Sequence, residues 1–350
     1  MAKILITGTA GFIGFHLVRR LLKEGHQIVG LDNINDYYDI NLKYARLAET
    51  GIYAVDETDH TGGKNRKFKE ITFGKIIQSI TSPDYRFIRL NLEDKSEINQ
   101  LFSKEKFDYI VNLAAQAGVR YSIDNPEAYI QSNIVGFFNI MEACRHYPVK
   151  HLVYASSSSV YGANAKIPFS ETDRVDNPVS LYAATKKSNE LMAYSYSHLY
   201  KIPTTGLRFF TVYGPWGRPD MSPILFANAI THGKPISVFN NGEMQRDFTY
   251  IDDITEVVTR VISIIPDNTP AYRLLNIGNG VPVNLMVFIE TLELFLGTQA
   301  EKKFLSMQPG DMVCTWADTE QIHRVVNYKP KTEINEGVGN FTKWFKGWIS

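Results

Sequence analysis

A tyrosine and a lysine four residues apart, Tyr182 and Lys186, are the pair in this sequence best suited to acid–base chemistry. The ordinary pKa of a phenol is about 10, so tyrosine acts as a base only when a neighbouring cation stabilises its anion. Residues at this spacing lie on one face of a helix, where the lysine can supply that charge. Because Tyr-x-x-x-Lys also arises by chance in helices, its weight depends on the surrounding sequence.

The amino terminus carries the pattern of a dinucleotide-binding turn. A short apolar run, Lys3–Thr7, leads into Gly8, Gly11 and Gly14, and a second apolar run ends at Asp32. Such glycines let the backbone approach a pyrophosphate at the positive end of a helix. A carboxylate at the end of the second strand can accept hydrogen bonds from the ribose hydroxyls and would repel a 2'-phosphate. The pattern therefore predicts NAD as the cofactor.

Composition argues against several other functions. Lysine plus arginine and aspartate plus glutamate both number 37, so no net field attracts nucleic acid or an anionic membrane. No apolar stretch approaches the ~20 residues that span a bilayer, and the first strand leaves no room for a signal peptide. Cys144 and Cys314 are far apart and suggest neither a metal site nor a disulfide. We expect a cytoplasmic protein without a metal, a nucleic-acid partner or a membrane.

Apolar runs alternate with helical stretches up to about residue 206, which predicts an α/β fold. The expected strands lie near 3–7, 27–32, 85–90, 108–113, 151–156 and 204–209. Crossover helices between them imply a Rossmann-type, doubly wound parallel sheet. Residues 50–82 interrupt this alternation as a polar insertion, which is either a functional loop or a tolerated surface insertion.

The order of these motifs resembles that of the extended short-chain dehydrogenase/reductases that act on nucleotide sugars. Leu113-Ala114-Ala115 is similar to the family's strand motif beneath the cofactor, and Asn133 resembles the asparagine on its next helix. Ala155–Gly162 resembles the strand that ends in the catalytic serine. The resemblance implies NAD as cofactor, a UDP-sugar as substrate and a homodimer.

The family's architecture also implies a division of the chain into two parts. Residues 1–206, with about 234–262, would form the NAD-binding domain. Residues 207–233 and 263–350 would form a smaller α/β substrate-binding lobe. The boundary between the two is therefore expected to be discontinuous in sequence.

The resemblance assigns roles to individual residues. Ser157 would hydrogen-bond the reacting sugar hydroxyl, and Tyr182 would take the proton from that hydroxyl. Lys186 would hold the nicotinamide ribose and lower the pKa of Tyr182. Asn91 stands where family members often have an aspartate that contacts adenine. The expected cofactor contacts are Gly8, Gly11, Phe12, Ile13, Gly14, Asp32, Asn33, Asn91, Leu92, Leu113, Ala114, Ala115, Asn133, Tyr182 and Lys186.

The residues after Ser157 help to distinguish between dehydration and epimerisation. The family's 4,6-dehydratases typically carry Asp and Glu at the positions of Ser158 and Ser159. Hydroxyls of ordinary pKa cannot perform that acid–base work, so dehydration is disfavoured. An epimerase needs only reversible oxidation and fits better, while a UDP-glucuronate decarboxylase shares the oxidation at C4 and remains an alternative.

The segment Arg208–Met221 resembles the corresponding loop of UDP-glucuronate 4-epimerases. UDP-galactose 4-epimerases usually carry Asn at the position of Thr211 and Arg at that of Gln308. Arg218 suits an anion contact because a guanidinium matches phosphate or carboxylate. The expected substrate contacts are Ser157, Ser159, Thr211, Arg218, Arg246 at the diphosphate, Gln308, and Asp311 at the uridine ribose.

These features together predict an NAD-dependent enzyme that converts UDP-glucuronate to UDP-galacturonate by oxidation and re-reduction at C4. The alternatives left open are a UDP-glucuronate decarboxylase and a 4-epimerase of UDP-glucose or UDP-N-acetylglucosamine. A regulatory protein that binds NAD without chemistry is a further alternative, although such relatives typically lose the Tyr-Lys pair.

Overall fold

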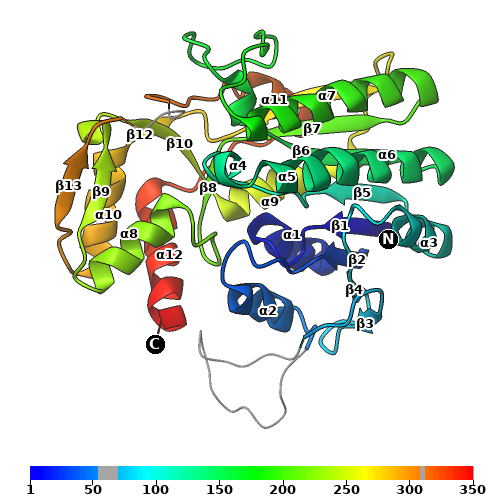
Figure 1. Cartoon of the computed structure of the whole chain (residues 1–350), viewed down its shortest axis with the longest axis horizontal. Helices are drawn as coiled ribbons and strands as arrows, with labels where there is room; N and C mark the ends of the chain where they lie inside the picture. Colours follow the sequence, from blue (N-terminus) through cyan, green and yellow to red (C-terminus); the bar gives the residue numbers. More distant parts are fainter. Residues whose placement is uncertain (54–69, 308–311, 350) are drawn as a thin grey trace.

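A large, mainly parallel sheet forms the centre of the computed structural model, which describes residues 1–53, 70–307 and 312–349 (Figure 1). Its strands, in spatial order, are β11 (Tyr272–Ile277), β7 (Thr204–Phe209), β6 (His151–Ser157), β5 (Tyr109–Asn112), β1 (Lys3–Thr7), β2 (Gln27–Asp32), β4 (Tyr85–Arg89) and β3 (Ile76–Gln78). Only the β3–β4 pair among these is antiparallel. Because the chain winds outward from β1 in both directions, the strand order reverses between β1 and β5, where such sheets bind ligands.

Helices cover both faces of this sheet. Neighbouring residues of a strand point to opposite sides, so apolar strand residues need packing partners on both faces. In β1, Ile4 and Ile6 pack in one apolar cluster and Leu5 packs in another. The first cluster includes residues of α1 (Phe12–Lys23), α2 (Ile40–Glu49), α9 (Ile251–Ser263) and α11 (Glu320–Val326). The second includes residues of α3 (Lys95–Glu105), α6 (Gly136–His146) and α7 (Leu181–Tyr200). Between the short helices α4 (Tyr121–Asp124) and α5 (Pro126–Tyr129) and helix α6 lies a π-helix, Ile130–Val135.

A third apolar cluster, at the left of Figure 1, is formed by residues of smaller sheets and three helices. One sheet contains β12 (Pro282–Asn284), β10 (Gln245–Tyr250) and β8 (Thr211–Tyr213), and the other pairs β13 (Lys302–Leu305) with β9 (Ile236–Phe239). The helices are α8 (Ser222–Thr231), α10 (Leu285–Leu296) and α12 (Ile334–Ile349). The loop between β8 and α8 runs from this region back towards the central sheet, and it carries Arg218.

All six strands expected from the sequence are present, within one residue of the expected ends. Three sheet memberships differ from the expected division of the chain. β11 lies in the range assigned to the substrate lobe but forms the edge of the large sheet beside β7. β9 and β10 lie in the range assigned to the NAD-binding domain, but β9 pairs with β13, and β10 pairs with β8 and β12. Short strands such as these are placed by long-range pairing, and local sequence does not reveal their partner. The division into two domains stays a prediction.

The predicted insertion, 50–82, contains one regular element in its described part. β3 lies in it and pairs with β4 (Figure 1), while residues 54–69 lie outside the described residues. No helix in the described chain combines the length and the apolar character needed to cross a bilayer.

Candidate active site

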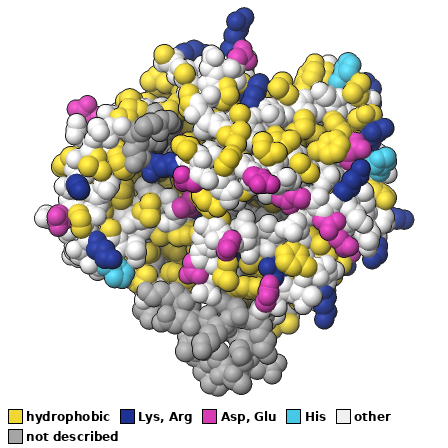
Figure 2. Space-filling model, in the orientation of Figure 1, with side chains coloured by type: hydrophobic (Ala, Val, Ile, Leu, Met, Phe, Trp, Pro, Cys, Tyr) yellow, Lys and Arg dark blue, Asp and Glu magenta, His cyan; other side chains and the backbone are white. Residues whose placement is uncertain are grey.

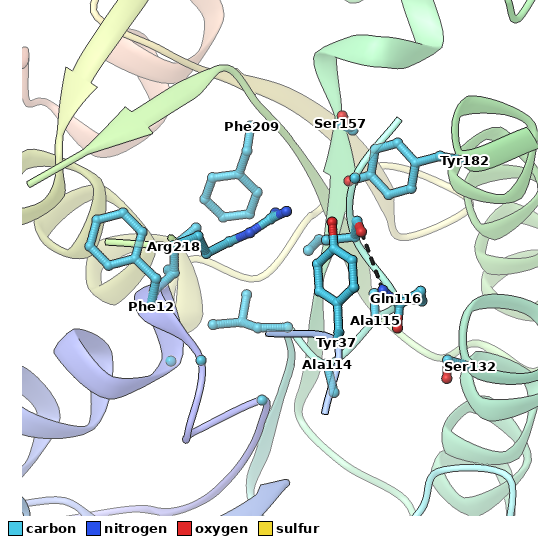
Figure 3. A pocket seen from close by; sticks show the side chains of 18 of the residues that line it. Phe12, Tyr37, Ala114, Ala115, Gln116, Ser132, Ser157, Tyr182, Phe209 and Arg218 are labelled. Carbon is cyan, nitrogen blue, oxygen red and sulfur yellow. Dashed lines mark hydrogen bonds between the residues drawn. The ribbon is translucent and has the colours of Figure 1, made fainter. Parts of the chain in front are cut away.

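A pocket lies beside the carboxyl ends of β1, β5 and β6, at the point where the strand order reverses (Figure 3). It extends from the glycine turn before α1 to the loop between β8 and α8. The predicted site residues that line it are Gly8, Gly11, Phe12, Ile13, Gly14, Asp32, Asn33, Leu92, Leu113, Ala114, Ala115, Ser157, Ser159, Tyr182, Lys186, Thr211 and Arg218. Residues far apart in sequence, which were singled out for separate reasons, therefore share one cavity.

The glycine turn is packed too closely for side chains. Gly8 has a positive φ of 77°, and its amide donates to Leu31 O at 2.7 Å. A Cβ at Gly14 would lie 2.1 Å from Gly8 O. Asp32 accepts hydrogen bonds from the amides of Ala10 at 3.1 Å and Ile34 at 2.8 Å, which hold its carboxylate at the end of β2. A close backbone turn at the start of a helix, with a fixed carboxylate beside it, fits the pyrophosphate and ribose of NAD.

The catalytic serine and tyrosine predicted from the sequence come from different elements. Ser157 ends β6, and its hydroxyl donates to Ser159 Oγ at 3.1 Å and accepts from Ser159 N at 3.1 Å. Tyr182 lies in the first turn of α7, and the hydroxyl of the N-cap residue Ser180 accepts from the amide of Ala183. Burial raises the pKa of Tyr182, and a hydrogen bond with Ser157 opposes this rise. The serine therefore helps to stabilise the phenolate.

Arg218 and Lys186 are the two cations near Tyr182. The positive charge of Arg218 lowers the pKa of the phenol against the larger effect of burial. The ammonium of Lys186 lies 5.9 Å from the centre of the Tyr182 ring and donates to Ala155 O at 2.9 Å. Burial lowers the pKa of Lys186 to about 8. Sequence reasoning considered only an anion contact for Arg218, and its position beside the phenol adds an electrostatic role.

Arg218 is held by two residues that sequence reasoning missed. Its Nε and Nη2 donate to the two carboxylate oxygens of Asp220, at 3.1 and 2.5 Å. The hydroxyl of Tyr37 donates to Asp220 Oδ2 at 2.9 Å. Burial and then the charge of Asp220 raise the pKa of Tyr37 to about 12, so the phenol stays neutral. The available signal for Asp220 was an acid two residues after Arg218.

Two further residues connect the same loop to the amino-terminal helices. Arg46, in α2, is fully buried and donates to Trp216 O and Gly217 O, and also to Ala10 O in the glycine turn. His16, in α1, lies 2.9 Å from Pro215 O through its Nε2. Burial lowers the pKa of His16 to about 3, so the ring is neutral and must donate its Nε2–H to the carbonyl. The loop backbone is thus bound to both helices.

Three predicted contacts do not line the pocket. Asn133, in the π-helix, accepts from Gln116 N at 2.8 Å and donates to Gln116 O and Thr185 Oγ1, so it ties the segment after β5 to α7. Asn91 accepts from Asn33 Nδ2 at 3.2 Å. Arg246 donates to the carbonyls of Gln245 and Val313. Gln308 and Asp311 lie outside the described residues.

Comparison with known proteins identifies the family. The model of the NAD dependent epimerase/dehydratase family matches residues 4–278. The chain belongs to this family. The family and the Rossmann-type fold class expected from the sequence are both confirmed.

Several similar proteins align with almost the whole of this NAD-dependent epimerase/dehydratase family member. Protein CapI of Staphylococcus aureus is 48% identical over 357 residues, which cover 98% of each protein. A probable UDP-glucuronate 4-epimerase of Rhizobium meliloti is 44% identical, over 98% of this chain and 96% of that protein. The crystal structure of the Bacillus cereus UDP-glucuronic acid 4-epimerase in complex with UDP-glucuronic acid and NAD has a TM-score of 0.83 at 30% identity and covers 99% of both chains.

The NAD-dependent epimerase/dehydratase family member holds no evident metal centre in its described residues, where no group of three or more His, Cys, Asp or Glu could bind an ion. The groups that line the pocket include hydroxyls, the phenols of tyrosines, carboxylates, and the cations Lys43, Lys186 and Arg218. This set can move a proton and bind an anion, and a hydride acceptor is needed to complete an oxidation.

Proposed function

We propose that this chain is an NAD-dependent enzyme that interconverts UDP-glucuronate and UDP-galacturonate by epimerisation at C4. The observation that carries the proposal is that Tyr182, Ser157 and Arg218 line the same pocket as the glycine turn. The relatives named as UDP-glucuronate 4-epimerases, which align over nearly the whole chain, support it.

The residues of the glycine turn and of β2 are suited to hold the cofactor. The turn at Gly8–Gly14 would bind the pyrophosphate, Asp32 the ribose of the adenosine half, and Lys186 the ribose of the nicotinamide half. NAD supplies the hydride acceptor and donor for C4 when it is bound. The buried lysine, with a pKa of about 8, carries its positive charge at neutral pH.

Tyr182 is the base and the acid of the proposed reaction. As a phenolate it removes the proton of the C4 hydroxyl, and as a phenol it returns a proton when the hydroxyl is restored. Ser157 donates to the phenolate or to the sugar oxygen, and Arg218 stabilises the negative charge on the phenolate. These groups favour the ionised tyrosine against the effect of burial.

Retaining the sugar carboxylate is the particular difficulty of this substrate. Oxidation at C4 of UDP-glucuronate gives a β-keto acid, which loses CO2 when the breaking bond stands perpendicular to the carbonyl plane. Ser159 and Thr211 line the same pocket and could hold the carboxylate out of that alignment by hydrogen bonds. Hydroxyl donors would thus direct the intermediate towards epimerisation.

Replacing Thr211 with alanine should increase the ratio of UDP-pentose to UDP-galacturonate among the products by roughly 10-fold, because the carboxylate loses a donor. The ratio is measured by NMR of the products. Thr211→Ser keeps the hydroxyl and should restore the original ratio. An unchanged ratio in the alanine variant would exclude this role for Thr211.

The direct test of the proposed function is incubation of the purified protein with UDP-glucuronate, followed by NMR of the products. Formation of UDP-galacturonate without CO2 supports the epimerase. UDP-xylose or a 4-keto pentose would instead identify a decarboxylase. If UDP-glucuronate is unchanged while UDP-glucose or UDP-N-acetylglucosamine is epimerised, the assignment of the sugar acid is wrong.

We also propose that the chain forms a homodimer through α6 and α7. Hydrophobic side chains gather over this region of the surface (Figure 2), and those exposed on α7 include Leu191, Tyr194 and Leu199. Leu191 is 59% exposed, so its replacement by glutamate should not disturb the core. We expect light scattering to give twice the chain mass for the original protein and the chain mass for Leu191→Glu. A monomeric original protein would contradict the proposal.

A further inference from the structure

We infer that Tyr37 and Asp220 are positioning residues that hold the guanidinium of Arg218 beside Tyr182. The inference rests on the proposed function, since it concerns how the site controls its tyrosine. The two residues lie in different segments: Tyr37 follows β2, and Asp220 lies in the loop between β8 and α8. Neither belongs to the glycine turn or to the set of Ser157, Tyr182 and Lys186.

The geometry of this group is specific. Asp220 accepts from two nitrogens of Arg218, in the paired arrangement that fixes the plane of a guanidinium. The same carboxylate accepts from the hydroxyl of Tyr37, and the centre of the guanidinium lies 6.0 Å from the Tyr37 ring. Figure 3 shows Tyr37, Arg218 and Tyr182 converging on the same part of the pocket. Tyr37 therefore restrains Asp220, and Asp220 restrains Arg218.

The charges in this group are fixed over the neutral range. Burial raises the pKa of Asp220, but the charge and hydrogen bonds of Arg218 outweigh that effect, so the carboxyl is ionised. Burial lowers the pKa of Arg218, but the charge of Asp220 and its hydrogen bond outweigh that effect. Arg218 and Asp220 thus form an ion pair that stays charged near neutral pH, and the phenol of Tyr37 stays neutral there.

The phenol of Tyr182 faces groups from four elements. Ser157 comes from β6, Lys186 from its own helix, and Tyr129 from α5, with a ring centre 6.0 Å away. Arg218 comes from the loop after β8, and its charge lowers the pKa of Tyr182. Because Arg218 has a long, flexible side chain, this effect depends on what holds its head group.

The loop backbone is held separately from the Arg218 side chain. His16 and Arg46 bind the carbonyls of Pro215, Trp216 and Gly217. Loss of the Tyr37 hydroxyl should therefore release the Arg218 head group without displacing the loop. A phenylalanine at this position also keeps its place, because the ring packs against Tyr121 with centres 4.7 Å apart.

Tyr37→Phe and Asp220→Asn are the variants that test the inference. Both should move the acid limb of the kcat–pH profile upwards, by up to about one unit, because the phenolate loses a nearby positive charge. At neutral pH we expect kcat to fall by roughly 10-fold, in keeping with the sensitivity of catalysis to small misplacements. Binding of UDP alone should change little in Tyr37→Phe, which would separate positioning of Arg218 from a general loss of the pocket.

Tyr121→Phe is the matched control. It removes a phenolic hydroxyl from the same aromatic cluster, one that accepts from Asn125 Nδ2 and does not contact Asp220. Its pH profile should match that of the original protein. An unchanged profile in Tyr37→Phe would overturn the inference, and so would a downward shift in Asp220→Asn, which would mean that Asp220 acts by weakening the charge of Arg218. Failure of the original protein to convert UDP-glucuronate would refute the proposed function instead.

Discussion

Replacing Tyr182 with phenylalanine is expected to reduce kcat for UDP-glucuronate epimerisation by roughly 10²- to 10⁴-fold, which is the usual contribution of a positioned acid–base group. The variant keeps the ring, whose edge-to-face contact with Tyr129 has centres 6.0 Å apart. It removes only the group that exchanges the proton with the C4 hydroxyl. The loss should therefore appear in kcat, with little change in the bound NAD measured by absorbance.

Tyr194→Phe is the control for this experiment. It removes a hydroxyl from the surface of the same helix that the proposed dimer would cover, where the side chain is 48% exposed in the single chain. Its turnover should equal that of the original protein. If Tyr182→Phe retained more than about a tenth of the original kcat, another group would have to be the base.

Replacing Glu190 with leucine is expected to have the largest effect on stability. It should lower the free energy of unfolding by about 3–5 kcal/mol. Glu190 on α7 and Arg208 on β7 are each 1% exposed and form two hydrogen bonds, at 2.8 and 2.9 Å. Ser156 Oγ also donates to Glu190 Oε1 at 2.7 Å. Removing the carboxylate leaves a buried guanidinium without its counterion, which is the costly state.

Urea denaturation of Glu190→Leu, followed by circular dichroism, would measure this loss. The exposed pair of Glu320 and Arg324, with side chains 76% and 78% exposed, provides the comparison. Glu320→Leu should cost less than about 1 kcal/mol because water screens the pair. Equal losses in the two variants would show that burial of the Glu190 pair does not set its contribution.

Resemblance to the family singled out Ser157, while local patterns in the sequence were sufficient for the glycine turn, the strands and the pair Tyr182 and Lys186. Each depends on a short run whose period or spacing has a direct physical meaning. The partners of Arg218 and of its loop were not predictable in this way. The bond from Tyr37 to Asp220 spans 183 positions, and that from Arg46 to Trp216 O spans 170. Such contacts exist only after the sheet has brought the segments together.

The same reason explains why the place of β11 in the large sheet was not predicted. Its sequence is suited to a strand, but its place in the large sheet follows from pairing with β7, as in Tyr272 opposite Thr204. Asn133 shows the converse case, since this predicted cofactor contact does not line the pocket and instead fixes the backbone of Gln116. The sequence identifies the type of residue and its approximate place more readily than the atoms it contacts.

The hydrogen bonds of Arg46 also limit which segments of this protein can be exchanged with those of related enzymes. One guanidinium joins Ala10 O of the cofactor turn to Trp216 O and Gly217 O of the loop that carries Arg218. Lysine at position 46 would offer three donors from a single centre and could not reproduce this planar set of bonds. A chimera that receives residues 214–221 from a related enzyme therefore carries a loop that packs against a different residue at position 46. Position 46 should be exchanged together with the loop.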